Sequence, residues 1–161
     1  MRQIDPHHDV VITTYNALTS TADLIQLYAP WVTPIFGGGS GHPDEALEAG
    51  DAIGLDLYLD SPHIAARDYT SVALRAKWKQ QSLAFWSDLA HGQGKQVWIN
   101  EVQAQPWNDE PSFQPADLLS SAVDYREEHV DVALLWGVET WLVNDEWMAA
   151  GQHAMQILRA P

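Results

Sequence analysis

Four short apolar runs alternate with longer helical patterns along the chain, and this alternation limits the folds open to it. Each run is nearly continuously apolar, which is typical of strands covered on both faces. Strands that alternate with helices form parallel sheets with right-handed crossovers. We therefore predict an α/β fold whose strands are Val10–Thr14, Ala52–Tyr58, Gln96–Asn100 and Val132–Trp136.

The connecting segments carry helical signals of unequal strength. Tyr69–Ala90 has apolar residues at three- and four-residue steps, and His91-Gly92 offers a C-terminal cap. Pro115–Glu128 has proline in its first turn, and Asn144 can cap a helix over Asp145–Leu158. Two shorter helices are expected in the first connection, at Thr21–Tyr28 and Pro43–Ala49.

Composition narrows the class of protein further. The chain has 161 residues, no cysteine, eight tryptophans and a formal net charge of −14. We interpret residues 1–161 as one domain, without disulfides or thiolate metal sites. The acidic balance argues against a nucleic-acid partner, and no apolar run is long enough to suggest a membrane partner. No signal-peptide pattern begins the chain, so a cytoplasmic location is expected if Met1 is the true start.

Polar and aromatic residues gather where the predicted strands end. In parallel α/β folds, functional sites form at the carboxyl ends of the strands. The amino ends begin with ordinary solvent-facing residues, so the two ends of the predicted sheet differ in character. The residues at or just beyond the carboxyl ends are Thr14, Tyr15, Asn16, Asp56, Tyr58, Asn100, Glu101, Gln103, Trp136, Glu139 and Trp141.

Glu101 is the sharpest candidate for chemistry. It follows the apolar run Val97–Ile99 directly, with no basic residue beside it. One interpretation is a nucleophile or acid/base at the rim of a barrel. The other is a structural carboxylate that caps a helix or pairs with a cation.

The four strand segments resemble strands five to eight of a glycoside hydrolase barrel. The segments DVVITTYNA, DAIGLDLYLD, VWINEVQAQPW and LLWGVETWL are similar to those of the large clan of (β/α)8 enzymes with catalytic glutamates on strands four and seven. The E-x-Q-x-x-x-W run is the most specific of these features. The resemblance implies a partial (β/α)8 barrel, the C-terminal half of such an enzyme, acting on β-linked sugars by a retaining mechanism.

The resemblance also assigns expected roles. Glu101 matches the nucleophile, Tyr58 the aromatic residue beside it, and Trp136 the platform under the sugar. The acid/base glutamate is expected upstream of Met1, in a missing N-terminal half-barrel, unless self-association completes the barrel. The other expected substrate-binding residues are Asn16, Gln103, Asp56, Glu139 and Trp107, of which Asp56 and Glu139 are also alternative acids and Trp107 can instead pack a loop.

Two alternatives to the enzyme remain open at this point. The chain can be a carbohydrate-binding half-barrel without catalysis, or an unrelated open α/β protein with an interaction role. Other signals are weak: His7-His8-Asp9 lacks convergent partners for a metal, and FGGGSG lacks the residues of a phosphate-binding loop. We expect no metal and no organic cofactor.

Overall fold

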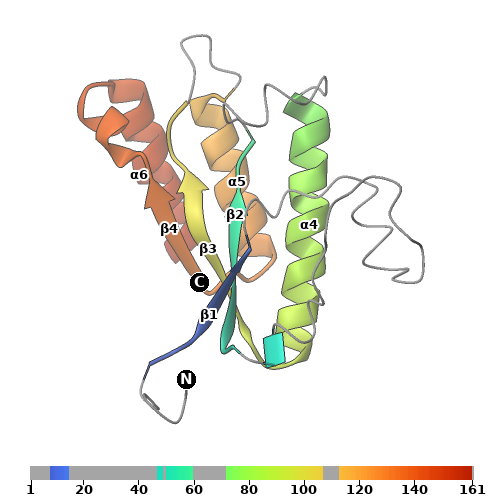
Figure 1. The fold of residues 1–161 in the computed structure, drawn as a ribbon. Helices are drawn as coiled ribbons and strands as arrows, with labels where there is room; N and C mark the ends of the chain where they lie inside the picture. Colours follow the sequence, from blue (N-terminus) through green and yellow to red (C-terminus); the bar gives the residue numbers. More distant parts are fainter. Residues whose placement is uncertain (1–7, 15–46, 49, 60–71, 107–112, 161) are drawn as a thin grey trace.

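Four parallel strands form one sheet in chain order in the computed structural model (Figure 1). The structure describes residues 8–14, 47–48, 50–59, 72–106 and 113–160. The predicted α/β class with a parallel sheet is confirmed. The strands are β1 (Val11–Thr14), β2 (Ala52–Leu57), β3 (Gln96–Gln103) and β4 (Val132–Trp136).

Within the described ranges, three long helices connect or follow the strands. They are α4 (Val72–Gly92), α5 (Pro115–Glu127) and α6 (Asp145–Arg159), with a short 3-10 helix, η1 (Val138–Leu142), between β4 and α6. The helices lie along one side of the sheet, with α5 and α6 packed side by side (Figure 1). Residues 47–48 are helical, while Thr21–Tyr28 and the rest of Pro43–Ala49 lie outside the described residues.

The C-terminus of α4 corrects the predicted cap. Gly92 is still helical, and Gly94 instead adopts the left-handed conformation, with a φ of 68°. The Gly94 N–H donates to the His91 carbonyl, and the Lys95 N–H donates to the Ala90 carbonyl, each at 2.9 Å. These two bonds form a Schellman motif, so α4 ends two residues later than predicted, while β3 begins at Gln96 as predicted.

The predicted N-cap of α6 is confirmed. The Asn144 side chain accepts hydrogen bonds from the backbone N–H groups of Glu146 at 3.0 Å and Trp147 at 3.2 Å. These are donors that the first helical turn leaves without an intrahelical partner. The cap fixes the direction in which α6 leaves η1.

Replacing Asn144 by alanine is expected to lower the free energy of unfolding by about 1 kcal/mol, because two backbone donors lose their acceptor. Urea denaturation followed by circular dichroism measures this change. Asn144→Asp is the matched control, since aspartate retains the acceptor oxygen and suits a helix N-terminus. Equal losses in the two variants would contradict the capping role.

The core lies between the helices and one face of the sheet. Alternate strand residues point to it, and these side chains are at most 1% exposed. Leu83 of α4 and Leu118 of α5 are fully buried against the same core. The sheet residues of this buried face are Ile53, Leu55, Leu57, Val97, Ile99 and Val102.

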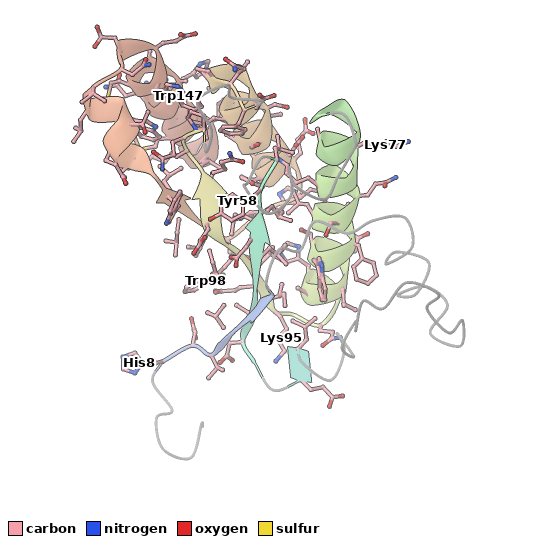
Figure 2. The ribbon with its side chains drawn as sticks, turned by 45° about the horizontal axis from the view of Figure 1, so that its top comes forward. His8, Tyr58, Lys77, Lys95, Trp98 and Trp147 are labelled. Carbon is pink, nitrogen blue, oxygen red and sulfur yellow. The ribbon has the colours of Figure 1, made fainter. Side chains whose placement is uncertain are left out.

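The opposite face of the sheet, which we call the open face, is less covered. Trp98, Val132 and Trp136 are half-buried on it, and Leu134 is 49% exposed. Trp98 lies on the other side of the strands from α4 (Figure 2). Of the predicted site residues, Asp56, Glu101 and Trp136 also lie on this face.

Residues at the amino ends of the strands hold neighbouring strands together. The Val10 N–H donates to the Asp51 carboxylate at 3.0 Å, and the Val97 N–H donates to the Asp131 carboxylate at 2.8 Å. The Lys95 ammonium donates to the Gly50 carbonyl at 2.6 Å. This end of the sheet therefore has structural roles, whereas the other end carries the candidate site.

Candidate functional site

An irregularity in β3 brings Glu101 to the open face. Ile99 pairs with Leu55 of β2, but the next pair is Glu101 with Asp56, so β3 has one extra residue at this point. In a regular strand, residue 101 would point to the same face as residues 97 and 99, which is the buried face. The bulge moves Glu101 to the open face and lets Val102 return to the core.

The extra residue, Asn100, occupies space that a glycine provides. Its side-chain amide lies against Gly54 on β2, and a methyl group at Gly54 would overlap that amide. Glycine in a strand interior often marks such a close approach. The pair Gly54 and Asn100 therefore accommodates the bulge that positions Glu101.

Tyr58 joins Glu101 to Trp136. The Tyr58 hydroxyl donates a hydrogen bond to Glu101 Oε2. The Tyr58 and Trp136 rings meet edge to face, with centroids 6.5 Å apart and planes at 88°. All three residues are half-buried, and each comes from the carboxyl end of a different strand. Figure 2 shows Tyr58 near the end of β2. We call Tyr58, Glu101 and Trp136 the Glu101 site.

The electrostatics of the site keep Tyr58 protonated. Burial raises the pKa of the Tyr58 hydroxyl well above its usual range, and the hydrogen bond to Glu101 and the nearby carboxylates raise it further. A phenol with a raised pKa remains a donor at every physiological pH. Tyr58 therefore keeps the proton that it donates to Glu101.

Asp56 is the second carboxyl group near the site. It pairs with Glu101 across the two strands, on the open face. Burial raises its pKa above the ordinary value, and the charge of Glu101 raises it further. Its Oδ1 atom is buried and accepts no hydrogen bond within the described residues.

Gln103 uses both ends of its amide on the backbone. Its Oε1 accepts from the Leu59 N–H at 3.0 Å, and its Nε2 donates to the Gln105 carbonyl at 3.2 Å. The side chain is only 3% exposed. In this structure Gln103 ties the segments that follow β2 and β3, and we leave it out of the groups proposed to bind substrate.

Three predicted residues remain, and the structure describes one of them. Glu139 is exposed in the first turn of η1, just after β4. Asn16 and Trp107 lie outside the described residues. The structure thus gathers Glu101, Tyr58, Trp136 and Asp56 from the predicted set.

Trp141 and Thr140 of η1 contact the segment that follows β3, and the sequence analysis assigned neither residue a role. The Trp141 indole Nε1 donates to the Ala104 carbonyl at 2.9 Å, and the Thr140 hydroxyl donates to the Gln105 amide oxygen. Both contacts join η1 to the segment after β3. Aromatic and polar residues close to a strand end were the available signal, but their partners depend on the fold.

A buried lysine forms a separate cluster between α4 and α5. The Lys79 ammonium is 2.6 Å from Ser121 Oγ, 3.6 Å from Asp124 Oδ2 and 5.0 Å from the centre of the Tyr125 ring. A serine beside a lysine can act as a nucleophile in some enzymes, but Lys79 is 1% and Ser121 4% exposed. No substrate reaches them, so we assign this cluster a structural role.

Neither a metal centre nor a membrane span emerges from the part of the chain that the structure describes. Its histidine, aspartate and glutamate side chains form no group of three or more able to hold a metal ion. His8 is exposed, and its neighbour His7 lies outside that part. No helix in the same ranges is long and apolar enough to cross a membrane.

Comparison of the chain with protein-family models, curated proteins and solved structures found no match. The function is therefore argued from the residues of the Glu101 site and their geometry.

Proposed function

We propose that the chain carries the nucleophile half of a retaining glycoside hydrolase that acts on β-linked sugars. The observation that supports this most is the hydrogen bond from Tyr58 to Glu101 beside the Trp136 ring. A retaining mechanism needs a carboxylate held rigidly on one side of the anomeric carbon. Glu101 lies on a strand, and its orientation is fixed by a hydrogen bond.

The chemistry divides between the two oxygens of Glu101. Tyr58 holds Oε2, which leaves Oε1 to attack the anomeric carbon. The bond between that carbon and the glycosidic oxygen breaks, and the leaving oxygen takes a proton from an acid. Water then hydrolyses the glycosyl ester and regenerates the carboxylate.

Trp136 is proposed to bind the sugar ring. Indole rings provide a flat apolar surface with one donor at the edge, and sugar rings present a C–H face that fits it. Trp136 is half-buried at the end of β4, beside the Tyr58 ring. A neutral sugar also suits a chain with a net charge of −14, because its binding does not depend on opposite charge.

The fold proposed for the complete enzyme is a (β/α)8 barrel. The described sheet supplies four parallel strands in chain order, and such a barrel has eight. We propose that the remaining strands and the acid/base glutamate come from an N-terminal half-barrel, or from a second copy of the chain. The acid must lie about 5 to 5.5 Å from Glu101 for the retaining geometry.

Covalent labelling of Glu101 tests the proposed function. Glycosides fluorinated next to the anomeric carbon and carrying a strongly activated leaving group need little acid assistance. They are therefore expected to form a stable ester with the chain. Peptide mass spectrometry should place the label on Glu101, across a panel of β-glucosyl, β-xylosyl and β-galactosyl probes.

Two variants control this experiment. Glu101→Gln is expected to lose labelling completely, whereas Tyr58→Phe should retain it at a rate lowered about tenfold, because the carboxylate loses its positioning bond. Sugar binding without any label would indicate the carbohydrate-binding alternative and would contradict the proposed enzyme. A label on another carboxylate would refute the role of Glu101.

A further inference from the structure

Asp56 and Glu101 form a cross-strand pair of like charge. They occupy paired positions on adjacent parallel strands and face the same side of the sheet. Neighbouring strands are about 4.8 Å apart, which brings such side chains into mutual reach. Two carboxylates directly opposite each other repel, and the repulsion is greatest when both are ionised.

The two carboxyl groups have different surroundings. Glu101 Oε2 accepts the Tyr58 hydrogen bond, whereas Asp56 Oδ1 is buried and has no hydrogen-bond partner within the described residues. An unpaired buried oxygen costs more free energy when it carries charge than when its group is neutral. The hydrogen bond therefore favours the negative charge on Glu101, and burial favours the proton on Asp56.

Within the described residues, the groups around the pair do not offset the repulsion. Tyr58 is a neutral phenol, and Asn100 and Gln103 of β3 are uncharged. On β4, Leu134 and Trp136 face the same side and carry no charge. The ion pairs that the described residues form, Lys79–Asp124 and His91–Asp131, include neither member of the pair.

We propose that Asp56 is a positioning residue for the nucleophile: it retains its own proton, so that the pair carries one negative charge and this charge resides on Glu101. This inference rests on the proposed function, because it explains how Glu101 stays ionised beside a second carboxyl group. Sites with two carboxyl groups commonly divide their roles through different surroundings.

The reaction itself changes this balance. When Glu101 forms the glycosyl ester, its negative charge disappears and the repulsion on Asp56 ends. Asp56 then becomes a stronger acid at the stage at which water must attack the ester. Asp56 thus responds to the state of the nucleophile without forming a bond to the sugar.

The titration of Asp56 tests the pair directly. Its carboxyl carbon can be followed by NMR as a function of pH in the wild-type chain and in Glu101→Gln, which removes the charge while keeping the shape. We expect the midpoint of the Asp56 titration to fall in the variant. A midpoint that does not move would overturn the proposal.

Stability provides a second measurement. Because the pKa of Asp56 is raised in the folded state, its contribution to stability is complete at low pH and is lost as the pH rises through that pKa. Asp56→Asn mimics the protonated form and avoids this loss. The difference in urea midpoint, Asp56→Asn minus wild type, should therefore increase from pH 4 to pH 7.

Asp9→Asn is the matched control for stability, since Asp9 is exposed and lies before β1, 47 residues before Asp56 along the chain. Its midpoint relative to wild type should stay constant over the same range. An Asp56→Asn difference that is equally constant would contradict the proposal.

The labelling experiment separates this inference from the proposed function. If Glu101 is labelled but the midpoint of the Asp56 titration is the same in wild type and Glu101→Gln, the proposed glycosidase is retained and the positioning role is rejected. If the midpoint changes but Glu101 is not labelled, the proposed glycosidase is rejected, and the positioning role, which depends on it, is rejected as well. The proposal is supported if Glu101 is labelled and the Asp56 midpoint falls in Glu101→Gln. In addition, the pH dependence of the labelling rate should show one ionisation fewer in Asp56→Asn than in wild type.

Discussion

Replacing Trp141 by alanine is expected to lower the free energy of unfolding by about 3 to 5 kcal/mol, the range for truncating a large buried aromatic side chain. The ring is 7% exposed, its Nε1 bonds the Ala104 carbonyl, and its edge lies against Gly151 of α6. The substitution leaves a cavity and removes the donor from a carbonyl at the end of β3. Urea denaturation followed by fluorescence and circular dichroism measures the loss.

Leu142→Ala is the matched control, because Leu142 is the next residue along η1 and is 78% exposed. It should change the free energy of unfolding by less than about 0.5 kcal/mol. Since Trp141 also holds the segment after β3, its loss should slow labelling of Glu101 as well. A stable Trp141→Ala chain with unchanged labelling would show that η1 does not support the site.

The stability of the protein is expected to rise by about 2 kcal/mol between pH 7 and pH 9.5, through Lys79. Burial lowers the pKa of the Lys79 ammonium to about 8, and the nearby Asp124 opposes this shift only in part. In the unfolded chain the same group has its ordinary pKa near 10.4. Between these values the unfolded state binds more protons than the folded state, so stability increases with pH.

Lys79→Met isolates this effect. Methionine fills similar volume without charge, and Ser121 keeps its hydrogen bond to the Asp117 carbonyl at 2.8 Å. Comparing urea midpoints at the two pH values in both chains removes the contributions of all other groups. The range stops below pH 10 because tyrosines of the unfolded chain ionise above it. A wild-type increase no larger than that of Lys79→Met would contradict the shifted lysine.

The element order of the fold was predictable because its signals are local. Continuous apolar runs such as Val132–Trp136 are typical of strands in parallel sheets, and this strand was predicted with the observed bounds. The expected cover on both faces is not seen for it, since Leu134 is 49% exposed on the open face. The Asn144 cap was equally readable, since the side chain bonds to the next turn. The gathering of Tyr58, Glu101 and Trp136 followed from the rule that parallel strands end on the same edge.

Other features depend on partners distant in sequence. Gln103 was expected to bind substrate, and its contacts could not be predicted, because its side-chain oxygen accepts from the N–H of Leu59, which is far away along the chain. The cap residue of α4 is Gly94 and not Gly92, because the carbonyls of the last turn accept from backbone N–H groups that lie beyond Gly92. The burial of Lys79 could have been predicted from the sequence. Lys79 lies on the same face of α4 as Leu83, Trp86 and Ala90, and it is buried with them.

The bulge at Asn100 gives β3 two phases. Up to Ile99, odd-numbered positions fill the interior, and beyond the bulge the even-numbered Val102 takes that place. In a scan of substitutions along β3, the positions at which stability is most sensitive should be Val97, Ile99 and Val102, which are separated by two and then three residues. The step of three marks the point at which Glu101, in place of a core residue, is turned to the open face of the sheet.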